Sequence, residues 1–401
     1  MTENSHNGSL GSREESGRPE KRSVIIICST TGGGDYVRAL RIGRTLGLNS
    51  FEVSVLAWNR GFSRSQLVSP PGVRLRVFNF PLRKSGRLAL FVAYALWWAF
   101  ISVSLMLERS KIFHAQGFFC YPPVILVGKL RQKRIVYDLV DFVADSFNWS
   151  RGARQAWGWW ESFCAALADG VMVVDLRKQD LPASRLRATA VVPNCPEDRT
   201  HGQTLTKRPG PFTIYYGGAI YEQRGIADVG EAIQSLPQAR LIVAGTGPDE
   251  SALRAKFGSP GSVQFLGLLN EDESVRLTME SDLVFALYDP RLPINRRAVS
   301  AKLFDAMMCG KPVLVNAEST ILAGLVTAEQ CGVIVPYGDV IAIRRAIQAL
   351  MDNPGIATVM GINGRKAFER EFNWNTMSRR LLHLYDEVLP YSGTPRGQSR
   401  D

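Results

Sequence analysis

The chain has 401 residues, 45% hydrophobic and 21% charged, which suffices for two ordinary domains and excludes a disordered or collagen-like protein. Its formal net charge of +11 favours an anionic partner. A nucleic acid, an acidic membrane surface and a phosphorylated substrate are the alternatives. The six cysteines are scattered without a CxxC pair, so we predict no zinc site, no disulfide framework and a reducing, cytoplasmic compartment.

The first half of the chain alternates short Val/Ile-rich runs with longer helical segments. A strand is predicted over Val24–Cys28, a helix over Tyr36–Leu46 and a second strand over Glu52–Ala57. This alternation is the βαβ signature of a parallel, doubly wound sheet. We therefore predict an α/β, Rossmann-like domain over residues 23–200.

An uncharged apolar run, Leu88–Leu107, lies within this domain. It is as long as a membrane-spanning helix, and basic residues flank it on both sides. A span would place strands of one sheet on opposite sides of a bilayer. We therefore expect a helix that packs partly on its domain and partly enters an acidic membrane surface through region 83–111, with a fully buried helix and a true span as the alternatives. Three tryptophans could extend this surface or pack in the core: Trp157, Trp159 and Trp160.

A second βαβ series follows a polar stretch at 201–210, which we interpret as a linker. Its strands are predicted over Phe212–Tyr216, Ala239–Ala244, Ser262–Phe265, Leu283–Ala286 and Pro312–Asn316, and its last helices over Ile341–Met351, Gly361–Glu371 and Asn375–Val388. This series predicts a second Rossmann-like domain over 211–372, with the segment 373–390 packing back toward the first. The polar ends, 1–22 and 391–401, are expected to be tails, the first without the apolar core of a secretory signal.

Glycine-rich turns follow several predicted strands. They contain Gly33 and Gly34 in the first domain, and Gly217, Gly218, Gly245 and Gly247 in the second. Glycine lets the backbone approach a ligand closely, and open α/β sheets bind ligands at the carboxyl ends of their strands. None of these turns forms a GxGxxG fingerprint or a GxxxxGK[ST] phosphate loop, so each could also be an ordinary turn.

Charged residues near these turns predict a site for a diphosphate. Arg224 follows the first strand of the second domain and can hold a diphosphate with two parallel hydrogen bonds. The strongest signal is the segment 300–315, which predicts a short helix that ends at Gly310 before a buried strand. Its first amides can meet a phosphate beside Lys302, and Asp305 lies one turn further, where a carboxylate can bind both ribose hydroxyls. Surface roles for Arg224 and Asp305 are the alternatives.

In this order the motifs resemble glycosyltransferase family 4 and its relatives of the GT-B fold, which are retaining enzymes that use nucleotide sugars. The likeness runs from about Ser23 to Val388. It is carried by the first glycine loop with Asp35, Arg38 and Arg41 behind it, and by 191–194, 216–218, 224–225, 243–248, 265–267 and 302–307. It implies two Rossmann-like, doubly wound domains that face each other across a cleft. It also implies transfer of a sugar in polysaccharide or glycoconjugate biosynthesis, without a metal or other cofactor. The basic, apolar helix of the first domain leads us to expect a glycan or lipid-linked glycan as the acceptor.

The resemblance implies roles for individual residues. Arg224 and Lys302 would neutralise the departing diphosphate, and Asp305 would fix the ribose. The other donor-binding positions are Gly33, Gly34, Gly217, Gly218, Gly245, Gly247, Gly267, Ala301 and Leu303. On the acceptor side stand His114 and Asp141, with a buried structural role for His114 as the alternative.

Four positions depart from the family pattern. Gly218 stands where many members have a phosphate-binding arginine, and Val140 where a histidine is usual. Of two expected glutamates, Arg297 stands at the place of the first and Asp305 replaces the second. Two alternatives therefore stay open: a sugar-nucleotide epimerase of the same architecture, and a non-catalytic nucleotide-sugar-binding subunit. No nucleic-acid partner is predicted, because no recognition module is visible. We expect a protein at the cytoplasmic face of the cell membrane.

Overall fold

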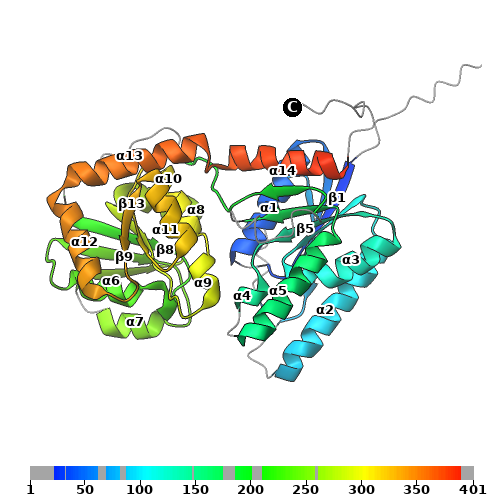
Figure 1. Cartoon of the computed structure of the whole chain (residues 1–401), viewed down its shortest axis with the longest axis horizontal. Coiled ribbons are helices and arrows are strands. Elements are labelled where there is room, and N and C mark those ends of the chain that lie inside the picture. The colour runs from blue at the N-terminus through cyan, green and yellow to red at the C-terminus, as the bar shows by residue number, and fades with distance from the viewer. Residues whose placement is uncertain are drawn as a thin grey trace, which may run out of the picture.

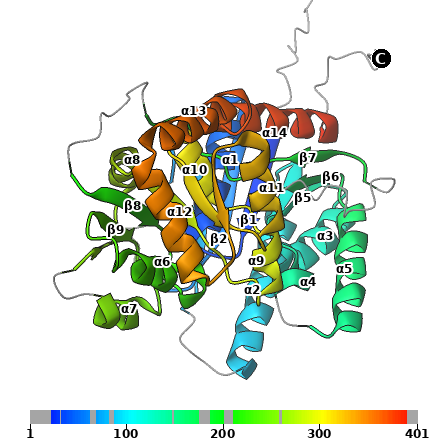
Figure 2. The ribbon, with the colours of Figure 1, turned by 60° about the vertical axis from the view of Figure 1, so that its left-hand side comes forward.

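The computed structural model describes residues 22–31, 33–61, 69–81, 87–146, 149–174, 186–200, 210–257 and 261–389. Two α/β domains stand side by side, and α14 (Trp374–Val388) crosses back from the second onto the first (Figure 1). Figure 2 shows α13 (Pro354–Arg370) and α14 following one another along the side that joins the domains. Residues 1–21 and 391–401 of the predicted tails, and residues 201–209 of the predicted linker, lie outside the described residues, whereas Arg22 begins β1.

The first domain is built on a seven-stranded parallel sheet with the order β3-β2-β1-β4-β5-β6-β7. The strands are β1 (Arg22–Cys28), β2 (Phe51–Asn59), β3 (Val73–Asn79), β4 (Ile112–Gln116), β5 (Arg134–Leu139), β6 (Gly170–Val173) and β7 (Thr189–Val191). Val24 to Cys28 are fully buried, as expected of a central parallel strand that helices cover on both faces.

The second domain is built on a six-stranded parallel sheet with the order β10-β9-β8-β11-β12-β13. The strands are β8 (Phe212–Gly217), β9 (Ala239–Ala244), β10 (Val263–Gly267), β11 (Leu283–Ala286), β12 (Val313–Asn316) and β13 (Gly332–Val335). Its helices are α6 (Ile226–Ile233), α7 (Glu250–Phe257), α8 (Glu271–Glu280), α9 (Pro293–Arg297), α10 (Ala301–Met308), α11 (Thr320–Glu329), α12 (Val340–Asp352) and α13. The predicted start of α13 at Gly361 was wrong, because Pro354 occupies the first turn of the helix, where proline is tolerated.

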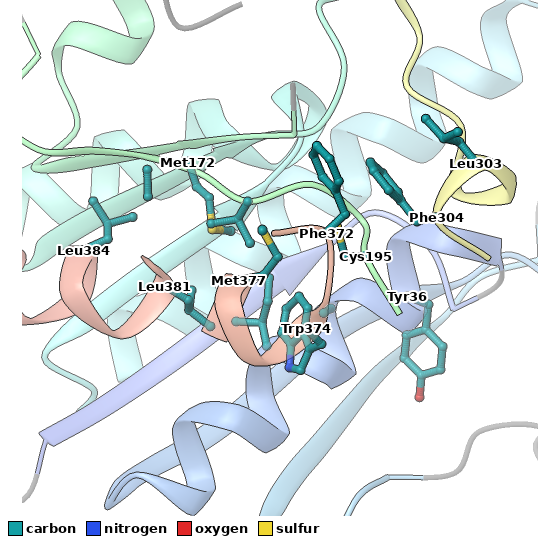
Figure 3. Packing of buried hydrophobic residues seen from close by; sticks show 14 of the residues in the cluster. Tyr36, Met172, Cys195, Leu303, Phe304, Phe372, Trp374, Met377, Leu381 and Leu384 are labelled. Carbon is teal, nitrogen blue, oxygen red and sulfur yellow. The ribbon is translucent and has the colours of Figure 1, made fainter. Parts of the chain in front are cut away.

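Helices cover the two faces of the first sheet differently. On one face lie α1 (Gly33–Leu48) and α14, and on the other lie α2 (Arg87–Leu107), α3 (Tyr121–Leu130) and α5 (Arg151–Ala166), with the short α4 (Val143–Ser146) before α5. The cluster beneath α1 and α14 continues into the second domain, where it includes Leu303 and Phe304 of α10 (Figure 3). The ring of Phe304 stacks on Phe372, with 5.4 Å between ring centroids. The domains therefore share a buried apolar core on the side where the chain crosses between them.

Helix α2 buries a narrow stripe and exposes the rest. Its buried residues recur every fourth position: Ala93, Trp97, Ile101 and Leu105. Around this stripe Leu88 is 78% exposed and Phe91 72% exposed. Among the described residues, Leu88–Leu107 is the one helix long and apolar enough to cross a membrane, and 22% of its most apolar window is buried. The alternative of a fully buried core helix is therefore wrong.

Candidate functional site

Helix α10 positions the second-domain residues of the candidate site. Ser300 caps the helix, since its hydroxyl oxygen accepts a hydrogen bond from the Lys302 amide at 3.2 Å. Leu303 and Phe304 are buried in the shared core, so they fix the orientation of the helix (Figure 3). Lys302 and Asp305 are both half-buried. The prediction that Leu303 binds the donor holds at most for its backbone, because its side chain lies in the core.

Two cations from separate elements meet at one tyrosine ring. The guanidinium carbon of Arg224, in η5 (Glu222–Arg224), lies 4.5 Å from the ring centroid of Tyr288. The amino group of Lys302 lies 6.0 Å from the same centroid and 4.7 Å from that of Tyr216. All three distances fall within the range of cation–π contacts. Sequence reasoning brought Arg224 and Lys302 together but missed Tyr288, whose available signal was its place two residues after the strand Leu283–Ala286.

The charges of this cluster depend on one another. Burial favours the neutral form of Lys302, but Tyr288 and Tyr216 outweigh burial and raise the pKa of the amine above its usual value. Burial would raise the pKa of Tyr288, but Lys302 and Arg224 lower it. Lys302 therefore stays a cation at neutral pH and can stabilise an anionic ligand.

Asp305 is a carboxylate in a setting that resists its ionisation. Burial raises the pKa of Asp305 to about 6, although Lys302 and Arg41 lower it. Arg41 belongs to α1 of the first domain, donates a hydrogen bond to the Cys195 carbonyl at 2.8 Å and lies 3.9 Å from the Glu271 carboxylate of α8. Charged groups of both domains thus surround Asp305.

The predicted glycine turns pack against each other at the carboxyl ends of the second sheet. A Cβ atom at Gly245 would lie 1.9 Å from the Gly218 carbonyl oxygen, and one at Gly247 would lie 2.0 Å from the Ile220 oxygen. The Gly218 amide donates a hydrogen bond to the Ala244 carbonyl at 2.9 Å, and the Gly245 amide donates one to the Gly267 carbonyl at 2.7 Å. Contact between adjacent loops therefore explains Gly245 and Gly247 without a ligand.

Gly218 lies close to Lys302, whereas Gly267 faces open space. A Cβ atom at Gly218, whose φ is +145°, would lie 3.1 Å from the amino group of Lys302, whereas one at Gly267 would meet no atom within 4 Å. A larger residue at position 218 would compete with Lys302 for space. Gly217 ends β8 and Ala301 opens α10, so both lie beside this cluster, while Gly33 and Gly34 form the first turn of α1.

The two residues predicted on the acceptor side, His114 and Asp141, differ in exposure. His114 lies in β4 and is fully buried, with its Nδ1 atom 2.6 Å from the Tyr385 hydroxyl of α14 and its Nε2 atom 3.8 Å from Asp138. Asp138 also accepts two hydrogen bonds from Arg38, at 2.7 and 3.0 Å. This enclosure corrects the acceptor-side assignment of His114 in favour of the structural alternative. Asp141 is exposed just after β5.

The departures from the family pattern lie in both domains. Val140 follows β5 and is 8% exposed, and Arg297 is exposed at the end of α9. Helix α9 contacts α4 of the first domain, so Arg297 stands where the two domains approach each other (Figure 1). Among the described residues, no group of three or more His, Cys, Asp or Glu side chains is placed to hold a metal ion.

Two parallel-sheet α/β domains that share an apolar core have the architecture of the GT-B fold. Residues 198–367, almost all in the second domain, match the family model described as "Glycosyl transferases group 1".

Curated relatives of this chain are named as glycosyltransferases. The chain is 26% identical over 162 residues to the GDP-mannose-dependent monoacylated alpha-(1-6)-phosphatidylinositol monomannoside mannosyltransferase of Corynebacterium glutamicum, covering 38% of this chain and 40% of that protein. It is also 26% identical over 165 residues to the D-rhamnosyltransferase WbpZ of Pseudomonas aeruginosa, covering 41% and 42%. The matches thus span less than half the length of these relatives.

Solved structures show the same fold over nearly the whole chain. Sucrose-phosphate synthase from Thermosynechococcus elongatus superposes with a TM-score of 0.70 at 19% identity, covering 92% of this chain and 100% of that one. HepE of Anabaena in complex with UDP superposes with a TM-score of 0.66 at 14% identity, covering 91% and 99%. At these identities the likeness shows the fold alone.

Proposed function

We propose that the protein is a retaining glycosyltransferase of the family 4 type. In this proposal it moves a sugar from a nucleotide-sugar donor to a glycan or lipid-linked glycan. The observation that carries the proposal is the meeting of Arg224 and Lys302 at Tyr288. Lys302 belongs to α10, the helix that also bears Asp305. The names of similar proteins, one a GDP-mannose-dependent transferase and one a complex with UDP, support a nucleotide-sugar donor.

The proposed chemistry needs positioning and charge stabilisation more than a protein nucleophile. As the bond between sugar and diphosphate breaks, negative charge develops on the leaving phosphate, and Arg224 and Lys302 stabilise it. Asp305 accepts hydrogen bonds from the ribose hydroxyls and so fixes the donor. The departing phosphate oxygen takes the proton of the acceptor hydroxyl, which attacks on the same face of the sugar. We expect no metal or organic cofactor in this scheme.

The test of this function is release of nucleoside diphosphate. Purified protein is incubated with uridine, guanosine and adenosine diphosphate sugars, and the free nucleotide and the donor are quantified by chromatography. We expect one donor to yield nucleoside diphosphate together with a transferred or hydrolysed sugar. An isomerised donor without release would indicate the epimerase alternative, and donor binding without any reaction would indicate the non-catalytic subunit.

The outer face of the first domain supports a lipid-linked acceptor. Helices α2, α3 and α5 lie together along this side of the domain (Figure 1). Their exposed apolar residues include Leu88, Phe91, Leu96, Trp98, Leu126, Leu130, Trp159, Trp160 and Phe163. Exposed basic residues accompany them, among them Arg109, Lys129 and Arg151. Apolar side chains with tryptophans and cations suit the interface of an acidic bilayer. We propose that this face seats the enzyme on the cytoplasmic surface of the cell membrane.

Flotation with liposomes tests the membrane contact. We expect the protein to float with vesicles that contain acidic phospholipid, and the double variant Phe91→Ser/Leu96→Ser to float roughly tenfold less, since it loses two exposed apolar groups. The matched control is Ile341→Ser/Ile356→Ser, which removes two equally exposed isoleucines from the second domain. A protein that stays at the bottom of the gradient, or a control that loses as much binding, would contradict this contact.

A further inference from the structure

Tyr288 joins the elements that carry the candidate site, although no expectation from the sequence included it. It is 6% exposed, and its backbone amide donates a hydrogen bond to the side-chain oxygen of Asn316 in β12 at 2.8 Å. Its hydroxyl donates to the Ser300 hydroxyl at 2.7 Å, and Ser300 is the cap of α10. The phenol is therefore held at both ends, by the sheet and by the start of the helix.

Arg224 and Lys302 are like charges that the fold brings to one ring. Like charges at short range repel each other, and burial strengthens the repulsion. The face of the Tyr288 ring carries partial negative charge, so it attracts both cations and offsets part of this repulsion. Ring and cations are thus arranged before any ligand arrives, which lowers the ordering cost of binding a diphosphate.

We propose that Tyr288 is a positioning residue that holds Arg224 and Lys302 ready for the diphosphate of the donor, so that the site distinguishes a nucleoside diphosphate from a monophosphate. This inference rests on the proposed function. In this proposal the ring of Tyr288 orients the cations, and its hydroxyl binds Ser300, the cap of α10.

The hydroxyl also gives the site a pH dependence that a purely structural tyrosine lacks. The charged or titratable groups facing the phenol are Lys302 from α10, Arg224 from η5 and Tyr216 from β8. The two cations lower the pKa of Tyr288, whereas burial raises that of Tyr216. A phenolate would take the place of the incoming anion beside the cations. Affinity for nucleoside diphosphate should therefore fall as pH rises through the pKa of Tyr288, and the fall should be smaller in Tyr288→Phe.

The experiment compares binding by calorimetry of the diphosphates of uridine, guanosine and adenosine, and of the matching monophosphates, to the wild-type chain and three variants. Tyr288→Leu removes the ring and should lower the preference for diphosphate over monophosphate roughly tenfold. Tyr288→Phe keeps the ring and should retain that preference at pH 7, with a flatter profile up to pH 10. Phe257→Leu removes a ring that is 7% exposed in the same domain, and it should leave the preference unchanged.

Three results would overturn the inference in distinguishable ways. If the wild-type chain binds a diphosphate and Tyr288→Leu keeps its preference over the monophosphate, the positioning role is wrong and the proposed function stands. If the wild-type chain binds none of the three diphosphates, both the inference and the proposed function are wrong. A loss of preference in Phe257→Leu equal to that in Tyr288→Leu would also contradict the role, because general destabilisation would then explain it.

Discussion

Replacing Lys302 with methionine should lower sugar transfer by roughly 10²–10³-fold, the usual loss when one group that stabilises transition-state charge is removed. Methionine keeps much of the apolar stem that packs beside Tyr216 but removes the amino group. Because the charge on the diphosphate grows as the sugar leaves, the loss should appear mainly in kcat. Initial rates of nucleoside diphosphate release at several donor concentrations measure it.

The matched control for this variant is Lys256→Met. Lys256 lies at the end of α7, away from the cation cluster. Its side chain is half-exposed and forms an ion pair with Glu231. Surface ion pairs contribute little to stability, so this variant should fold and turn over like the wild-type enzyme. An equal loss of rate in both variants, or a Lys302→Met enzyme with normal kcat, would contradict the role given to Lys302.

Asp305→Asn should stabilise the fold while weakening the recognition of ribose. The pKa of Asp305 is raised from 3.8 to about 6, so the folded state disfavours the ionised carboxylate. Above pH 6 the group is ionised in both the folded and the unfolded state, and this cost is fully present. As pH falls from 6 towards 3.8 the cost diminishes, because the folded form is protonated first. Allowing for partial exposure, the asparagine should raise the free energy of unfolding by about 1–2 kcal/mol at pH 7.5.

Two measurements separate these effects. Urea unfolding should show that Asp305→Asn has a higher free energy of unfolding than the wild type at pH 7.5, and that the difference is smaller at pH 5. Calorimetry with ribonucleoside and dideoxyribonucleoside diphosphates should show a preference for ribose of about tenfold or more in the wild type, which the variant loses because it lacks one acceptor oxygen. A variant that is less stable at pH 7.5, or one that keeps the ribose preference, would contradict this account of Asp305.

The parts of the fold that have strong local signals could be predicted from the sequence. The alternation of Val/Ile runs with helical segments predicted β1 and β2 of the first sheet and β8 to β12 of the second, and the Gly310 stop predicted the short helix that became α10. Strands without such a prediction include β3, β7 and β13. Strand β3 has alternating exposure at a sheet edge, and β7 has three residues, so neither has the long apolar run of a buried strand.

The candidate site was harder to predict because its residues meet through tertiary contacts. Tyr288 packs against Arg224 and Lys302, which lie on different elements, and no spacing in the sequence signals that contact. Similarly, the burial of His114 against α14 depends on a helix 271 positions away. Gly218 was noted as a departure from a family arginine, but the close approach of the Lys302 amino group to that glycine is visible only in three dimensions.

The central claim is that Arg224, Lys302 and Asp305 form one site for a nucleoside diphosphate at the start of α10. A crystal structure of the chain with the nucleoside diphosphate released in the transfer assay tests it most directly. We predict that the two phosphates contact Arg224 and Lys302, and that the ribose hydroxyls lie within hydrogen-bonding distance of the Asp305 carboxylate. A nucleotide bound elsewhere, with these three side chains uncontacted, would contradict the account.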